Sequence, residues 1–259
     1  MDRSATVHDP REEVTPDGTI RTGATRNAIA PVYDPILRAA GDVVEKRGAL
    51  YVYGSVATGT AVVPTSDVDL LSIGLPAHEA ARISAELSAR FRDRCRAVSI
   101  GAAMQEDLEA ASDEAYGLRV FLRHYCVHLE GADPASGLPE YPADARAVRG
   151  FNGDVALHRA RWWSELEQAE SVSGLATRIA RKTLLAVAGL VSLRDATWST
   201  DRRACAARWD ELEPRSQVTT LVGWLDAPTH DRVEVQRELE RTVASVVRAF
   251  ETEIGLWPD

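Results

Sequence analysis

The residues with the clearest chemical potential are Asp67 and Asp69, which are separated by one residue and followed by Leu70 and Leu71. The apolar composition of residues 66–73 predicts a buried strand. Alternate residues of a strand point to one face, so the two carboxylates would project together, with Cα atoms about 6.6 Å apart. Two such carboxylates repel each other unless a cation lies between them. Oxygen ligands of this kind suit Mg²⁺, so the pair predicts a metal site for phosphoryl or nucleotidyl displacement.

Gly54 and Ser55 form the second half of the predicted site. The apolar run 49–53 predicts a buried strand that ends at Gly54, where glycine permits a tight turn. We expect a short helix from Val56, whose free N–H groups would attract an anion, while the Ser55 hydroxyl adds a donor. The sequence therefore predicts a phosphate cradle twelve residues before the acidic pair.

The spacing of these residues resembles the nucleotidyltransferase superfamily, the DNA polymerase β-like group, in which a Gly-Ser turn precedes D-x-D on the next strand. The matching residues are Gly54, Ser55, Gly59, Ser66, Asp67 and Asp69. The alternative is a surface turn followed by two solvent-facing acids, which the apolar residues around the acids disfavour.

Chain length, motif position and a helical C-terminal half resemble the bacterial aminoglycoside adenylyltransferases of the streptomycin and spectinomycin type. The resemblance implies that ATP and drug bind between an N-terminal nucleotidyltransferase domain and a C-terminal helical domain. It also implies that a basic residue of the loop within residues 181–209 reaches the triphosphate, a place held here by Arg202 or Arg203. Ser66 would position the acidic strand or touch phosphate.

Apolar periodicity predicts a mixed α/β half followed by a helical half. Together with the resemblance, this implies an α+β protein, with a mixed sheet flanked by helices followed by a helical bundle. We expect a flexible tail over residues 1–27, a nucleotidyltransferase domain over 28–140 and a helical substrate- and nucleotide-closing domain over 141–259. The expected strands are 49–53, 66–73, 96–104 and 125–129. The expected helices are 31–47, 77–92, 107–122, 175–193, 203–209 and 233–250.

Charge and composition limit the classes of molecule that this protein is expected to bind. The net charge of −9 disfavours nucleic acid and favours a small cationic acceptor beside the nucleoside triphosphate. No apolar run is long enough for a membrane span, and the N-terminus does not resemble a secretory signal. Three widely spaced cysteines predict buried free thiols in a cytoplasmic protein. We expect either a monomer or a homodimer.

One departure from the family pattern concerns a third carboxylate, which the resemblance places on the strand 96–104. Val98 or Ser99 stands at that place, and the strand contains no acid. Glu106 and Asp107 follow it and are one substitute. The other is an acid of the helical half, where Asp195, Asp201 and Asp210 lie near the loop.

The predicted function is a Mg²⁺-dependent transfer of AMP from ATP to a hydroxyl of a small molecule, with an aminoglycoside-like acceptor as the specific hypothesis. Asp67 and Asp69 would hold the metal, and Arg202 or Arg203 would neutralise charge on the leaving pyrophosphate. Two alternatives stay open: a toxin-like nucleotidyltransferase acting on tRNA or protein, and a catalytically degenerate nucleotide-binding regulatory module.

Overall fold

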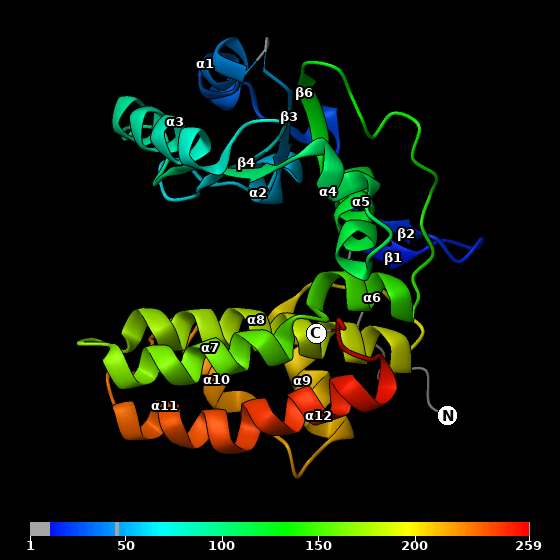
Figure 1. The fold of residues 1–259 in the computed structure, drawn as a ribbon, viewed down its shortest axis with the longest axis vertical. Coiled ribbons are helices and arrows are strands. Elements are labelled where there is room, and N and C mark those ends of the chain that lie inside the picture. The colour runs from blue at the N-terminus through cyan, green and yellow to red at the C-terminus, as the bar shows by residue number, and fades with distance from the viewer. Residues whose placement is uncertain (1–10, 45–46, 259) are drawn as a thin grey trace. The chain divides into compact units, whose positions relative to one another are not determined.

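The computed structural model describes residues 11–44 and 47–258 and confirms the predicted α+β class. Contacts divide these residues into two units. The sheet unit holds residues 21–141, and the helical unit holds residues 142–258 together with residues 11–20. The four-stranded sheet lies in the sheet unit, and the helices that follow residue 142 make up most of the helical unit (Figure 1).

The sheet unit is organised on a four-stranded mixed sheet with the strand order β5-β4-β3-β6. Its strands are β3 (Ala49–Tyr53), β4 (Val68–Ile73), β5 (Val98–Ala103) and β6 (Val127–Glu130). The strand β3 pairs antiparallel with both β4 and β6, whereas β4 and β5 run parallel. Each of the four predicted strands is thus present, with bounds shifted by up to two residues.

The two faces of the sheet pack against different helices, as the alternation of strand side chains requires. Leu50, Val52 and Leu70 face one core, which also holds residues of α1 (Asp34–Val44) and α3 (Ala77–Arg90). Tyr51 and Leu71 face the opposite core, with residues of α4 (Gln105–Glu109) and α5 (Asp113–Tyr125). Since Asp69 lies between Val68 and Leu70, its side chain belongs to the α4 and α5 side.

The helices of the sheet unit differ from the predictions in three places. The first expected helix is divided into η3 (Pro31–Tyr33) and α1. The helix expected over 107–122 is two helices, because the Ser112 side chain accepts a hydrogen bond from Ala115 N and begins α5 as an N-cap. The short helix α2 (Gly54–Ala57) begins two residues before the predicted start.

The segment assigned to a flexible tail has regular structure where it is described. β1 (Glu13–Val14) and β2 (Ile20–Arg21) form a two-stranded sheet, and η2 (Arg26–Ala28) follows. Ile20 is buried, and Glu12 accepts hydrogen bonds from Thr200 N and Oγ1. These strands have only two residues each, too few for a recognisable period. Residues 1–10 of the predicted tail lie outside the described residues.

The helical unit is formed around α8 (Ser173–Arg194), which α7 (Val155–Gln168) accompanies side by side (Figure 1). Most apolar residues of α8 are buried, as expected from a helix that is apolar almost all round. The expected helix 233–250 is interrupted by the π-helical turn η4. The remaining elements of this unit are α6 (Ala145–Asn152), α9 (Arg202–Leu212), α10 (Thr219–Gly223), α11 (Arg232–Glu238), η4 (Leu239–Val243) and α12 (Ala244–Glu253).

None of the helices within the described ranges combines the length and apolar composition that crossing a bilayer requires. The cysteines are free thiols; Cys95 and Cys205 are buried and Cys126 is half-buried.

Candidate active site

The aspartate pair and the Gly-Ser turn lie together at one end of the sheet. Asp69 is the register partner of Tyr53, the last residue of β3, so the turn that begins at Gly54 starts directly beside Asp69. Asp67 precedes β4 by one residue, and strand alternation directs it to the same face as Asp69. The geometry therefore brings the phosphate-binding and metal-binding halves of the predicted site into contact.

Gly54 shows how closely the turn approaches the acid. Its φ of +66° lies in the left-handed region, which side chains other than glycine seldom adopt. A Cβ atom at this position would lie 2.9 Å from Asp69 Oδ2. Glycine at position 54 therefore serves both the backbone of the turn and the space that the Asp69 carboxylate occupies.

Tyr53, the register partner of Asp69, contacts α5. Its ring meets Phe121 edge-on, with centroids 5.0 Å apart. Burial, followed by the negative charge of Asp69, raises the pKa of Tyr53 to about 12.

Asp67 is bound by a cation from the segment that precedes β5. Arg96 Nε donates to Asp67 Oδ1 at 2.9 Å, and Arg96 Nη2 donates to Asp67 Oδ2. This bidentate arrangement raises the pKa of the Arg96 guanidinium, chiefly through the hydrogen bond to Asp67. Both oxygens of Asp67 thus accept from one guanidinium.

The two predicted serines have different surroundings. Ser66 Oγ accepts a hydrogen bond from Val62 N at 2.8 Å, and Ser66 N donates to Val62 O at the same distance. These bonds close the turn before β4, which matches a positioning role. Ser55 is half-buried, and its Oγ bonds to none of the residues in the described ranges, so it is free to donate to a ligand.

The position where the family resemblance places a third acid is occupied by Ser99. Ser99 is the parallel register partner of Asp69 and is exposed on the same face. Among the described residues, no group of three His, Cys, Asp or Glu side chains could hold a metal. Two carboxylates with substrate phosphates still suit one Mg²⁺, so the donor set fits a single nucleotide-bound ion.

The substitutes considered for the third acid have other surroundings. β5 runs parallel to β4 and ends at Ala103 opposite Ile73, which is four residues beyond Asp69, about 13 Å along the strand. Glu106 and Asp107 follow that far end. Asp107 Oδ2 also accepts from Met104 N at 2.7 Å and begins α4. The parallel register therefore does not favour either residue as a ligand beside Asp69.

The three acids of the helical unit are engaged within that unit. Arg208 binds Asp195 through two hydrogen bonds of 2.9 and 3.1 Å. Asp201 caps α9 by accepting from two backbone N–H groups. Asp210 accepts from Val218 N and Thr219 Oγ1, both at 2.7 Å. Each of these carboxylates has a structural partner that explains its presence.

The helical unit contains a cavity of about 460 Å³, here called the basic pocket, between α7, α8 and the start of α9. Five cationic side chains line it against a single acid, Glu165, which pairs with Arg178. Arg161 and Arg181 have no ion-pair partner among the described residues. The lining consists of His158, Arg161, Trp162, Glu165, Arg178, Arg181, Lys182, Leu185 and Arg202.

Arg202 and Arg203, predicted as alternatives for phosphate binding, lie in different environments. Arg202 lines the basic pocket, and its Nε donates to Arg181 O at 3.0 Å. Burial, and then the positive charge of Arg181, lower the pKa of Arg202. Arg203 instead forms an exposed ion pair with Asp226 at 2.6 Å and does not line the pocket. A crowded, half-buried cation is stabilised by an anion, so the geometry favours Arg202.

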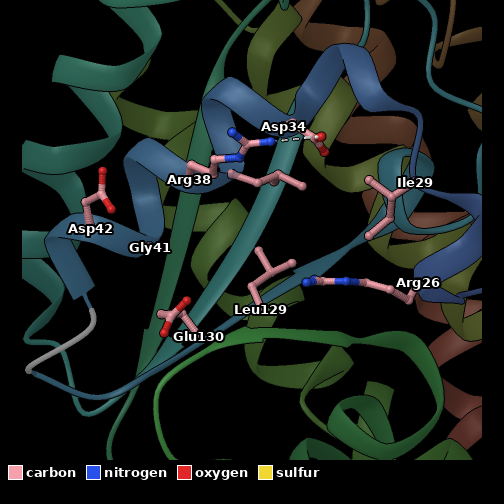
Figure 2. Close-up of a pocket in the computed structure, with 9 residues that line it drawn as sticks. Arg26, Ile29, Asp34, Arg38, Gly41, Asp42, Leu129 and Glu130 are labelled. Carbon is pink, nitrogen blue, oxygen red and sulfur yellow. Dashed lines mark hydrogen bonds and ion pairs between the residues drawn. The ribbon is translucent and has the colours of Figure 1, made fainter.

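A second cavity, of about 610 Å³, lies in the sheet unit between α1 and β6. Figure 2 shows Arg26 extending toward Leu129, and Arg38 joined to Asp34 on α1. Its lining mixes both charges around an apolar floor and includes none of the predicted site residues. This cavity is therefore separate from the aspartate pair.

No family model and no curated protein sequence matches the chain. Among solved structures, the fold is similar to the crystal structure of spectinomycin adenyltransferase AAD(9) from Enterococcus faecialis with ATP and spectinomycin. The TM-score is 0.53 at 10% sequence identity, and the match covers 84% of this chain and 99% of that chain. The chain has a nucleotidyltransferase fold. The resemblance expected from the Gly-Ser and D-x-D motif is thus confirmed for the nucleotidyltransferase fold, which here carries the motif on β3, α2 and β4.

Two features of this nucleotidyltransferase fold were missed by sequence reasoning. The Arg96 contact with Asp67 depends on the parallel register of β4 and β5, which composition does not specify. The basic pocket had a visible signal, because the adjacent cations Arg181 and Lys182 interrupt an otherwise apolar helix.

Proposed function

We propose that this protein is a Mg²⁺-dependent adenylyltransferase that moves AMP from ATP to a hydroxyl group of a small acceptor. The observation that carries the proposal is the contact between the Gly54 turn and Asp69, with Asp67 on the same face. A phosphate-binding turn and a carboxylate pair at one strand end suit a metal-bound triphosphate.

In this reaction the acceptor hydroxyl attacks the α-phosphorus of ATP, the bond to the β-phosphate oxygen breaks, and pyrophosphate leaves. Asp69 and Asp67 would hold the metal, which when bound supplies Lewis-acid polarisation of the phosphoryl oxygens. Ser55 Oγ and the backbone of the Gly54 turn would bind phosphate oxygens, and Ser66 would keep the acidic strand in place. Arg202 would neutralise charge on the leaving pyrophosphate.

An aminoglycoside-like antibiotic is the acceptor class that we propose, which would make the activity a form of antibiotic resistance. The net charge of −9 supports a cationic acceptor. The similarly folded adenyltransferase was solved with ATP and spectinomycin. The test is incubation with ATP, Mg²⁺ and a panel of aminoglycosides and aminocyclitols, with pyrophosphate release as the readout. Release with one or more members supports this acceptor class, and no release across the panel removes it.

A second candidate function is a nucleotide-binding regulatory module without transfer. Ser99 in place of an acid beside Asp69, together with the Arg96 contact to Asp67, favours this candidate. The two functions differ in one experiment: Mg²⁺-ATP would raise the melting temperature in both, but only the transferase releases pyrophosphate.

A further inference from the structure

Arg96 is fixed beside Asp67 by the backbone as well as by its side chain. Arg96 N donates to Ser66 O at 3.1 Å, and Val68 N donates to Ala97 O at 2.9 Å. These bonds join the two residues before β5 to Ser66 and Val68, the neighbours of Asp67 on either side. The guanidinium therefore starts from a backbone position that is paired to the Asp67 segment, and it reaches both carboxylate oxygens.

This contact changes what the acidic pair can bind. A carboxylate that accepts two hydrogen bonds from a guanidinium has fewer lone pairs for a metal, and the positive charge repels a divalent ion. Arg96 stays protonated at any physiological pH, so proton loss does not release Asp67. On the other side of Asp69, the parallel partner is the neutral Ser99. Of the two acids, Asp67 is the one whose two oxygens both accept from Arg96.

We propose that Arg96 takes the place of one metal ion, so that the sheet unit binds a single divalent cation through Asp69 and the nucleotide phosphates. Arg96 supplies the second positive charge and keeps Asp67 neutralised. This inference rests on the proposed function, because it takes a metal-bound nucleoside triphosphate as the ligand. It narrows the two metal ligands of that proposal to Asp69, since both oxygens of Asp67 accept from Arg96.

The test counts bound Mn²⁺ by electron paramagnetic resonance in the full chain saturated with α,β-methylene-ATP, a non-transferable analogue. The wild type should bind one Mn²⁺ per chain. Arg96→Gln should bind free Mn²⁺ about tenfold more tightly without nucleotide, because a +1 charge about 5 Å from a +2 ion in water is removed. Arg94→Gln is the matched control: it removes the same charge from the same loop, where Arg94 lies 3.9 Å from Asp93 and does not contact Asp67. It should leave Mn²⁺ affinity within about twofold of wild type.

The outcomes separate the inference from the proposed function. Two Mn²⁺ ions per wild-type chain, or unchanged Mn²⁺ affinity in a folded Arg96→Gln variant, would overturn the role of Arg96 while leaving nucleotide binding intact. Failure of the wild type to bind the analogue with any divalent ion would instead overturn the proposed function, and the inference with it. Circular dichroism melting confirms that each variant is folded.

Discussion

Replacement of Gly54 by alanine tests the contact between the turn and the metal-binding acid. The added methyl group would stand 2.9 Å from Asp69 Oδ2 on a backbone with φ of +66°. A left-handed conformation costs an L-residue about 1–2 kcal/mol. For a unit of this size, that corresponds to a melting temperature lower by about 4–10 °C.

The functional effect of Gly54→Ala should exceed this loss of stability. The closest atom is the end of the Asp69 side chain, so the carboxylate would rotate away while the backbone stays in place. Changes that misorient a metal ligand lower metal affinity by roughly 10- to 100-fold. Isothermal titration calorimetry with α,β-methylene-ATP and Mg²⁺, well below the melting temperature, measures this loss.

Gly59→Ala is the matched control, because it adds similar backbone strain at a position where the new Cβ does not meet the Asp69 carboxylate. Gly59 has a similar φ of +71°, and a Cβ there would lie 2.8 Å from the backbone oxygen of Ala28. This variant should be destabilised at least as much as Gly54→Ala, yet its folded fraction should lose less affinity for the Mg²⁺-analogue than Gly54→Ala, because its added Cβ meets a backbone oxygen and not the Asp69 carboxylate. Wild-type affinity in Gly54→Ala would show that the turn does not determine the orientation of the Asp69 carboxylate.

Three further predictions concern single side chains. Asp69→Asn should keep its melting temperature within a few degrees and lower Mg²⁺-dependent pyrophosphate release at least about a hundredfold, so normal turnover would exclude Asp69 as a metal ligand. Arg202→Gln should weaken analogue binding, measured by calorimetry, by about tenfold or more, because a charged hydrogen bond is lost. Arg203→Gln should change this affinity less than about twofold, since Arg203 pairs with Asp226. Equal losses in the two variants would contradict the choice of Arg202 as the phosphate-binding arginine. Burial, opposed by Asp154, lowers the pKa of His158 below its ordinary 6.5. The contribution of His158 to stability is therefore present above pH 6.5 and is lost as the pH falls. The free energy of unfolding in urea should decrease from pH 7.5 to pH 5, and His158→Gln should make this decrease smaller.

The sequence predicted the local elements of the site because their signals are short-range. These signals are the apolar run 49–53, the glycine at its end and the alternation around Asp69. Each depends only on neighbouring residues, and the observed β3, α2 and β4 agree with them. The break between α4 and α5 was missed although Ser112 is a typical N-cap, because the apolar period continues across it.

The features that sequence did not predict depend on register and on pairing between elements. The Asp67–Arg96 contact needs the parallel pairing of β4 with β5, and a shift of one residue would direct Arg96 to the other face. The preference for Arg202 over its neighbour Arg203 needs the direction in which α9 begins, which adjacent arginines in a sequence cannot show.

The proposed function requires that the Gly54 turn and Asp69 together hold a metal-bound triphosphate. A crystal structure of the full chain with α,β-methylene-ATP and Mn²⁺, with an anomalous difference map, tests it most directly. We expect an anomalous peak within about 2.5 Å of an Asp69 carboxylate oxygen, with nucleotide phosphates at the Gly54–Ser55 turn. A bound analogue whose phosphates and Mn²⁺ both lie away from Asp69 and the turn would contradict it.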